Sequence, residues 1–182
     1  MNLDDYQNFV VKLASDKSDL ATAAIGICDE SAELFSATGE GAATLADVLK
    51  ECSDVLWYCT YGAYRLGTAL STMLSQTTQT DLTDCYGDRA ALISSLSFFR
   101  ESLVVRAGSV AGAIKKVLYH GHDAGVEHVE WKISLVLESL LGIAAVFGIT
   151  TQEIIDANVE KLSQRYGEKF SEERSIWRKE GV

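Results

Sequence analysis

The chain contains no proline anywhere in its 182 residues. Proline is the strongest breaker of a helix interior, because it lacks a backbone donor and its ring clashes with the preceding turn. Apolar residues recur here at helical intervals over long stretches, 47% of the residues are hydrophobic, and no segment alternates convincingly like a β-strand. The sequence therefore predicts an all-α protein built as a helical bundle.

Helical patterns are predicted over nine stretches, with a polar linker in the middle of the chain. The linker is Ser75 to Asp84, which is rich in Thr, Gln and Asp. It separates a first half, 1–80, from a second half, 81–182, and we expect the two to pack as one compact unit because each alone has only a small core. The predicted helices are 3–15, 18–38, 44–66, 69–77, 87–106, 109–119, 126–147, 151–165 and 171–180.

Two pairs of acidic residues on consecutive predicted helices form the most informative motif. Glu30 and Glu33 lie near the end of one helix, Glu51 and Asp54 lie early in the next, and seventeen residues separate the pairs. Residues three apart lie on one face of a helix, with Cβ atoms about 5–6 Å apart. Each pair therefore offers two carboxylates in the same direction.

The turn between these helices is predicted to bring the two pairs level. Glycine accepts the left-handed backbone that ends a helix, so the first helix is expected to end at Gly39 or Gly41. Thr44 and Asp47 form a pattern like a capping box, which starts the next helix. In the resulting antiparallel hairpin, the two acidic residues nearer the turn come level with each other, and so do the two that lie farther away.

Four carboxylates gathered in this way repel one another and raise their own pKa values unless a cation neutralises them. An all-oxygen ligand set suits a hard ion, so we predict Mg²⁺, with Mn²⁺ as a substitute. Acidic residues three apart are also common on solvated helix faces, but here the acidic stripe borders an apolar one, which favours a site. The apolar stripe of the second helix of the hairpin is Leu45, Val48, Leu49, Cys52, Val55, Leu56 and Cys59.

The two halves align as an imperfect internal repeat. At an offset of 81 the third predicted helix matches the seventh, and at an offset of 76 the region of the first acidic pair matches a region of the second half. The second half carries Arg106, Ser109, Lys132 and Leu135 in place of the four acidic residues, so it cannot hold the ion. It also has polar and basic residues that the first half lacks, namely Lys115, Lys116, Asn158, Lys161 and Arg165.

The charge of the chain narrows the classes of partner. Its 26 acidic and 16 basic residues give a net charge of −10, which repels a phosphate backbone and argues against nucleic acid. A small anion held through a metal is compatible with that charge. The acidic N-terminus lacks the pattern of a secretory signal, and the apolar stretch from Ile133 to Ile149 is shorter than a membrane span of about 20 residues. We therefore expect a cytoplasmic protein without a membrane partner.

Cysteine and histidine indicate neither disulfides nor zinc. The four cysteines show no CxxC spacing, and three of them lie within helical patterns, where they act as small apolar residues. The histidines lack cysteine partners at the spacings that zinc sites use. They are His120, His122 and His128.

Taken together, the motifs resemble those of the MazG-like all-α nucleoside triphosphate pyrophosphohydrolases, over most of the chain. The most specific elements are the acidic signature and the run that follows it. The matching segments are Asp29-Glu30-x-x-Glu33, Glu51-x-x-Asp54-Val55-Leu56-Trp57-Tyr58, Lys115-Lys116-Val117-Leu118, His120-Gly121, and Asn158-x-x-Lys161-Leu162-x-x-x-Arg165-Tyr166.

Members of that family usually carry all of these elements in one short unit and dimerise to complete their sites. This chain instead distributes them over two units in tandem. The resemblance therefore implies an intrachain pseudo-dimer of two degenerate MazG-like repeats, with one site whose metal ligands come from the first half and whose cations come from the second. A homodimer of such pseudo-dimers is compatible with this arrangement.

The resemblance also implies an activity, the Mg²⁺-dependent hydrolysis of a (deoxy)nucleoside triphosphate to its monophosphate and pyrophosphate, for house-cleaning or control of nucleotide pools. In this interpretation Glu30, Glu33, Glu51 and Asp54 are the metal ligands and the catalytic residues, and one of these carboxylates orients or deprotonates the attacking water. The substrate-binding residues are Lys115, Lys116, Asn158, Lys161 and Arg165, and Tyr58 is placed to stack on the base or touch the sugar. The resemblance favours dUTP or dCTP as the substrate.

Two other hypotheses stay open at this point. A non-catalytic nucleotide-binding or regulatory protein is compatible with the loss of the ligand set in one half. Carboxylates on facing helices also build di-iron centres, but the chain has no Glu-x-x-His motif, which argues strongly against iron.

Overall fold

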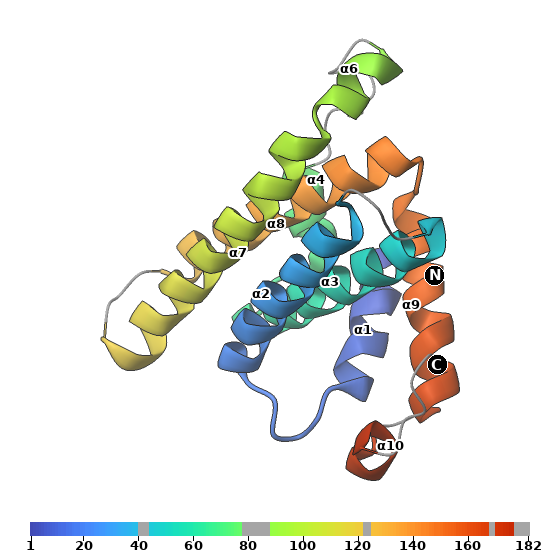
Figure 1. Cartoon of the computed structure of the whole chain (residues 1–182). Helices are drawn as coiled ribbons and strands as arrows, with labels where there is room; N and C mark the ends of the chain where they lie inside the picture. Colours follow the sequence, from blue (N-terminus) through green and yellow to red (C-terminus); the bar gives the residue numbers. More distant parts are fainter. Residues whose placement is uncertain (40–43, 78–87, 122–124, 168–169, 177–182) are drawn as a thin grey trace.

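The computed structural model describes residues 1–39, 44–77, 88–121, 125–167 and 170–176. Every regular element in these residues is an α-helix, which confirms the predicted all-α bundle (Figure 1). The helices are α1 (Leu3–Leu13), α2 (Leu20–Ala37), α3 (Leu45–Leu66), α4 (Leu70–Thr77), α6 (Arg89–Ser94), α7 (Leu96–Tyr119), α8 (Val126–Phe147), α9 (Thr151–Tyr166) and α10 (Glu172–Ile176).

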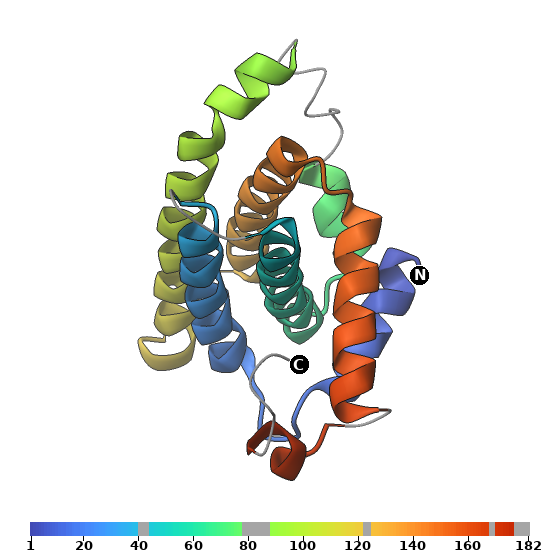
Figure 2. The ribbon, with the colours of Figure 1, turned by 45° about the vertical axis from the view of Figure 1, so that its right-hand side comes forward.

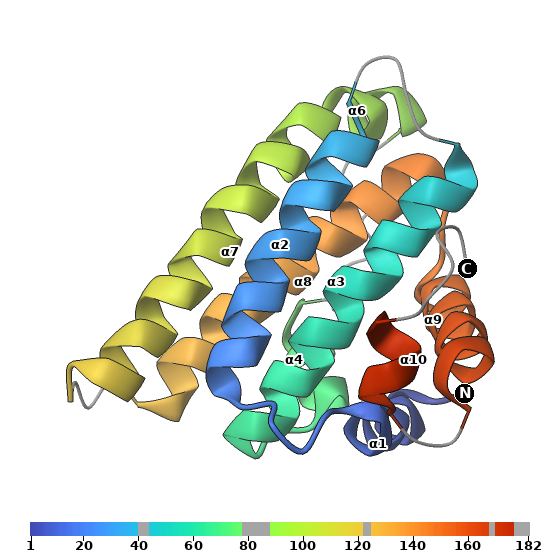
Figure 3. The same cartoon turned by 60° about the horizontal axis from the view of Figure 1, so that its bottom comes forward.

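Two long helical hairpins, α2–α3 and α7–α8, form the body of the molecule (Figure 3). They pack face to face, with α2 against α7 and α3 against α8. The helix that follows each hairpin then packs on the other one, because α4 lies against α8 and α9 lies against α3. Figure 2 shows α9 beside α3, with α1 close to it. The two halves of the chain therefore share one continuous core.

The boundaries of the second helix in each hairpin recur with the offset that the sequence repeat predicts. α3 and α8 both have 22 residues, and they start 81 residues apart (126−45). Each ends at a glycine with left-handed backbone, Gly67 at φ 81° and Gly148 at φ 73°, again 81 residues apart. Likewise, α2 starts at Leu20 and α7 at Leu96, 76 residues apart.

The predicted capping box is present where the turn of the first hairpin leads into α3. Thr44 is the N-cap of α3 and forms a capping box with Asp47, whose carboxylate accepts hydrogen bonds from the backbone N–H and the hydroxyl of Thr44. α2 ends with Thr38 as its C-cap, and Gly39 follows directly. The alternative end point, Gly41, lies outside the described residues.

The prediction of two separate helices at 87–106 and 109–119 is wrong. α7 runs through Gly108 without a break, since an exposed helical glycine costs only about 1 kcal/mol and the buried side chains on either side of it favour one continuous helix. The break occurs instead at Ser95. The hydroxyls of Ser94 and Ser95 both donate to the carbonyl oxygen of Ala91, at 2.7 and 3.0 Å, which satisfies the end of α6 locally.

The core consists of the apolar faces that the helical periodicity predicts. On α3 the buried positions include Val48, Cys52, Val55, Leu56 and Cys59, whereas Leu45 in the first turn is exposed. The cysteines of the described residues, Cys28, Cys52 and Cys59, are free thiols, and Cys85 lies outside them. The predicted linker begins within α4 and otherwise lies outside the described residues, as do His122 and the end of the last predicted helix.

Among the described helices, no single one is long and apolar enough to cross a membrane. Only α8 and α9 taken together pass that test of length and composition, and they meet at an angle of 99°.

Candidate metal centre

Three acidic residues of the first hairpin converge in space. Glu30 on α2 and Glu51 and Asp54 on α3 each offer a carboxylate oxygen, and these three oxygens all lie within 4.8 Å of one another. The hairpin turn produces this convergence, because it places the end of α2 beside the start of α3. The structure thus brings together three of the four predicted ligands.

A glycine allows the two helices to approach closely just beyond the acidic cluster. The ring of Tyr58 lies directly over Gly26, where an added Cβ would come within 2.2 Å of the ring carbons. Any other residue at position 26 would therefore push α3 or the Tyr58 ring away from α2. The sequence alone did not indicate this role for Gly26.

Glu51 is the most buried member of the cluster, with 8% of its surface exposed. Its Oε1 accepts a hydrogen bond from Lys50 Nζ at 2.6 Å. Its Oε2 is also buried, and no nitrogen or hydroxyl donor of the described residues reaches it. A buried carboxylate oxygen without a donor is costly, because it has lost its hydration without replacement.

The pKa of Glu30 shows the strongest effect of the neighbouring carboxylates. Burial, and then the charges of Asp54, Glu33 and Glu51, raise its pKa from 4.5 to about 8. Without a cation, this carboxyl therefore holds a proton at neutral pH. A positive ion among the same oxygens would favour the carboxylate form, because it reverses the sign of the local field.

Glu33, on α2, lies outside the close trio and is exposed. Partial burial, the charge of Glu51 and a hydrogen bond shared with the Glu51 carboxyl raise the pKa of Glu33. The charge that acts most strongly on Glu33 is thus that of Glu51, and the one that acts most strongly on Glu30 is that of Asp54. These are the two levels of the hairpin that the sequence spacing predicts.

A cation from the second half of the chain contacts the cluster. Lys161 on α9 forms an ion pair with Asp54, and its Nζ also lies 3.2 Å from Ser53 Oγ. The side chains of Lys161 and Asp54 are 15% and 22% exposed, so the pair is largely shielded from water. Within the described part of the chain, Lys161 and Lys50 supply the ammonium groups that contact the acidic cluster.

Asn158, predicted to bind substrate, has no exposed surface in this structure. Its Nδ2 donates to the carbonyl oxygen of Ser53 at 3.0 Å, and its Oδ1 accepts from the Tyr6 hydroxyl at 3.0 Å. Because both ends of the amide are engaged, Asn158 holds α9 against α3 and α1 rather than facing a ligand. It thereby positions Lys161, which lies one turn further along the same face.

Tyr58 borders the cluster from α3. It is half-buried, and burial together with the charges of Glu30 and Asp54 raises its pKa to about 12. Trp57 contacts Tyr58 edge to face with ring centroids 4.8 Å apart and stacks on Tyr61 at 5.6 Å. Trp57 therefore belongs to an aromatic cluster on α3.

Arg165 lies one turn beyond Lys161 on α9 and is half-buried, with its guanidinium 6.0 Å from the ring centroid of Tyr166. Lys115 and Lys116 lie elsewhere. Because Cys28 contacts Ala107 and Phe35 contacts Arg100, α2 and α7 run antiparallel, which places the two lysines level with the start of α2. Glu30 is ten residues along α2 from Leu20, about 15 Å at 1.5 Å per residue.

The equivalent positions of the second hairpin hold no acidic cluster. Arg106 on α7 donates to the carbonyl oxygen of Leu135, to Glu138 and to Ser139, at 2.8, 3.0 and 2.9 Å. Lys132 donates to Ser109. These side chains join α7 to α8 directly, where the first hairpin has facing carboxylates.

The residues of the first cluster fit a hard divalent ion on two counts. All of the converging donors are carboxylate oxygens, and the buried Oε2 of Glu51 needs a positive partner that the described residues do not supply. Sequence reasoning missed Lys50, Ser53 and Gly26. Lys50 adjoins an acidic residue in the sequence, but Ser53 and Gly26 matter only through contacts made across the fold.

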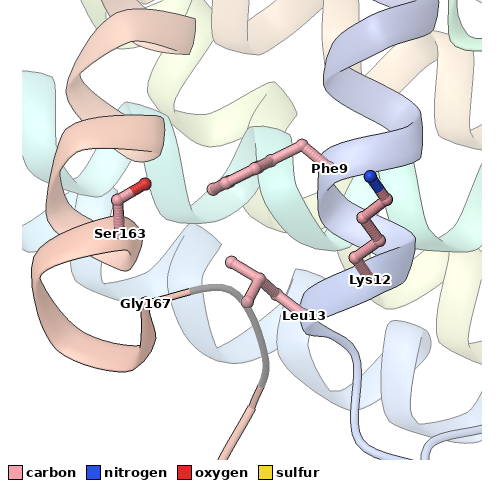
Figure 4. A pocket seen from close by; sticks show the side chains of 5 residues that line it. All are labelled: Phe9, Lys12, Leu13, Ser163 and Gly167. Carbon is pink, nitrogen blue, oxygen red and sulfur yellow. The ribbon is translucent and has the colours of Figure 1, made fainter.

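A separate hollow of about 510 Å³ lies between α1 and α9 (Figure 4). None of the acidic residues lines it. Its walls are Phe9, Lys12, Leu13, Ser163 and Gly167.

No protein-family model, curated protein or solved structure matches the chain. The resemblance to the MazG-like enzymes therefore depends on the motifs themselves.

Proposed function

We propose that the protein is a Mg²⁺-dependent nucleoside triphosphate pyrophosphohydrolase with one composite site per chain. The observation that carries this proposal is the convergence of Glu30, Glu51 and Asp54 within 4.8 Å, beside a lysine that comes from the other half. Carboxylates that gather a metal next to cations suit a substrate that is itself a chain of phosphates.

The residues of the chain divide the chemistry between them. A divalent ion held by the carboxylates offsets the charge of the phosphates and lowers the pKa of a bound water. Glu33 lies at the rim, close to Glu51 but outside the trio, so it is the carboxylate best placed to orient or deprotonate the attacking water. Lys161 and Arg165 are one turn apart on α9, and they bind the outer phosphates.

The ion pair of Lys161 with Asp54 suggests that Lys161 changes its partner when metal and substrate bind. In the ligand-free chain, Lys161 neutralises a metal ligand. A divalent ion held by the same carboxylates would supply that neutralisation, and the ammonium group of Lys161 would then be available to bind a phosphate oxygen. Tyr58, beside Glu30, faces the nucleoside part of the substrate, where its ring stacks on the base.

Three features support a pseudo-dimeric origin of the site. The helices α3 and α8 share their length and their glycine ends at an offset of 81 residues. α4, which follows the first hairpin, packs on the second, and α9, which follows the second hairpin, packs on the first, as the corresponding helices of two associated units do. The acidic set belongs to one hairpin, whereas Lys161 and Arg165 belong to the helix after the other.

The first test is the release of pyrophosphate from a panel of nucleoside triphosphates with Mg²⁺ or Mn²⁺, and we expect dUTP or dCTP to be preferred. Glu51→Gln and Asp54→Asn should abolish release while the helical circular dichroism signal is retained. Glu160→Gln is the matched control, because Glu160 is exposed on α9 and should tolerate the change.

Two results would separate the alternatives. Tight triphosphate binding without any pyrophosphate release would identify a non-catalytic nucleotide-binding protein, as the second hypothesis requires. Wild-type turnover by Glu51→Gln would refute the metal assignment itself.

A further inference from the structure

Three buried polar side chains connect α1 to the acidic cluster. Tyr6 on α1, Asn158 on α9 and Ser53 on α3 have no exposed surface. The Tyr6 hydroxyl donates to Asn158 Oδ1 at 3.0 Å. Asn158 Nδ2 donates to the carbonyl oxygen of Ser53 at 3.0 Å and lies 3.4 Å from Ser53 Oγ. One set of hydrogen bonds therefore joins three helices that lie side by side (Figure 2).

The direction of these hydrogen bonds is fixed by what each group can offer. Ser53 Oγ donates its single proton to the carbonyl oxygen of Lys50 at 2.7 Å. It can therefore only accept from Asn158 and from Lys161, whose Nζ lies 3.2 Å away. The Asn158 amide must then turn its nitrogen towards Ser53, which leaves its oxygen to a donor on the other side. Within the described residues, Tyr6 is the donor that reaches this oxygen.

The surroundings of Tyr6 keep its hydroxyl protonated. Its ring lies nearly parallel to that of Phe9, with the centroids 6.5 Å apart. Burial, and then the charge of Asp54, raise the pKa of Tyr6 well above its ordinary value. The hydroxyl therefore stays a hydrogen-bond donor at neutral pH and above.

We propose that Tyr6 is a positioning residue, which acts through the Asn158 amide to hold Lys161 beside the acidic cluster. Asn158 and Lys161 are three residues apart on one face of α9, so a bond that fixes the amide also fixes the level of the ammonium group. The first helix is thereby a third part of the composite site. The positioning itself does not depend on the proposed function, whereas its effect on phosphate binding does.

Loss of the Tyr6 hydroxyl should act on this contact and leave the fold intact. The helix α9 has apolar anchors of its own, because Ile154, Ile155 and Leu162 are buried. Without the hydroxyl, Asn158 Oδ1 is buried and lacks its donor, which is a costly state. The amide can gain a new partner only by moving, and Lys161 moves with it.

The first test measures the position of Lys161 without any substrate. The metal-free full chain is treated with acetic anhydride, and the acetylation rate of each lysine is measured by mass spectrometry. In the wild type, the Lys161 side chain is 15% exposed and ion-paired, so it should react slowly. Tyr6→Phe should raise its rate about fivefold or more, because an interaction that holds it is lost.

A second variant and an internal reference accompany this test. Ser53→Ala removes the oxygen that accepts from Lys161, and it should raise the acetylation rate of Lys161 by a similar factor. Lys132, partly buried in the second hairpin and bonded to Ser109, is the reference. Its rate should not change, whereas a general loosening of the fold would raise both rates.

The second test separates positioning from stability through kinetics. Tyr6→Phe should raise the KM for the triphosphate about threefold and change kcat by less than about twofold. In a chain that also carries Lys161→Gln, it should have no further effect on KM, because the group it positions is gone. Thr60→Val is the matched control, since it removes a buried hydroxyl that donates within α3, and it should leave KM and the acetylation rates unchanged.

Three results would overturn the proposal. They are an unchanged acetylation rate of Lys161 in either Tyr6→Phe or Ser53→Ala, an equal rise at Lys132, and an undiminished effect of Tyr6→Phe on KM when Lys161→Gln is present. A wild type that releases no pyrophosphate would refute the proposed function instead, and the acetylation rates would still decide the role of Tyr6.

Discussion

The two hairpins of this protein have second helices of the same length and opposite chemistry at the facing positions. In α2–α3 the facing positions carry carboxylates, the Oε2 of Glu51 lacks a donor among the described residues, and the pKa of Glu30 is raised to about 8. In α7–α8 the same positions carry Arg106 and Lys132, which hydrogen-bond directly across the hairpin.

This difference shows which of the two hairpins needs a ligand to neutralise its side chains. At these positions the second hairpin pairs its polar side chains with its own atoms, because Arg106 and Lys132 donate to partners on α7 and α8. The first hairpin leaves buried oxygens and mutual repulsion that only a proton or a cation relieves. The need for a ligand, and not the helical framework, distinguishes the two.

The largest expected effect is a difference in activity between substitutions at equivalent positions of the two hairpins. Glu51→Gln should lower Mg²⁺-dependent pyrophosphate release by about a thousandfold, because a metal ligand is lost. Lys132→Gln, at the equivalent position of the second hairpin, should change it by less than about threefold. Steady-state kinetics at saturating Mg²⁺ measures both variants. Equal losses would mean that the hairpins do not differ in function.

The second prediction concerns the glycine that each hairpin places under an aromatic ring. An added Cβ would lie 2.2 Å from the Tyr58 ring at Gly26 and 2.3 Å from the Phe99 ring at Gly142. Gly26→Ala and Gly142→Ala should each destabilise the fold by about 2–3 kcal/mol, because the ring must move. Only Gly26→Ala should also weaken Mg²⁺ binding, measured by calorimetry.

The control for these variants is Gly108→Ala on the open face of α7. A Cβ there meets nothing within 4 Å, so the substitution should stabilise the helix by about 0.5–1 kcal/mol. Urea denaturation compares the three variants, and a Gly26→Ala protein as stable as the wild type would contradict the close packing of Tyr58 on α2.

The third prediction is a pH dependence that belongs to the first hairpin. Glu30 has a pKa of about 8 in the folded chain and 4.5 ordinarily, so the folded state binds its proton more tightly. That contribution to stability is fully present below pH 4.5 and is lost as the pH rises to about 8. The metal-free protein should therefore melt about 5 °C lower at pH 8 than at pH 6.

Either Mg²⁺ or the substitution Glu30→Gln should remove the Tm difference that is due to Glu30. Mg²⁺ neutralises the carboxylates, and Glu30→Gln removes the titrating group. The lowered pKa values of Asp19, Asp47 and Glu153 act in the acid range, whereas the raised pKa of Glu33 acts in the same direction as that of Glu30. The part of the difference that Glu30→Gln removes is therefore the part that belongs to Glu30. A metal-free Tm that is flat from pH 6 to pH 8 would rule out this account of Glu30.

The smallest expected effect concerns the cations. Lys161→Gln should raise the KM for the triphosphate about tenfold, because a phosphate contact is lost. Lys12→Gln also removes one positive charge, but Lys12 lies on α1 and lines the hollow in Figure 4, so this variant should leave KM unchanged. If both variants behaved alike, net charge and not the site would explain the result.

Local pattern sufficed for the helices and for the convergence of the acidic residues. The spacing of Glu30, Glu33, Glu51 and Asp54 around one turn is a short-range geometry, because helical periodicity and a capped turn determine which side chains come level. The same reasoning failed at Gly108, where it predicted a break. Burial on both sides of an exposed glycine favours continuity, and burial is a property of the fold.

The sequence by itself determined the helical class, the hairpin of the first half and the acidic side chains that meet within it. Only the tertiary structure decided which distant cations join them: Lys161 contacts Asp54, whereas Lys115 and Lys116 lie on another part of the surface. It also turned Asn158 inward, to Tyr6 and Ser53. The physical reason is that residues a few positions apart are related by the helix alone, whereas residues a hundred positions apart are related only by packing.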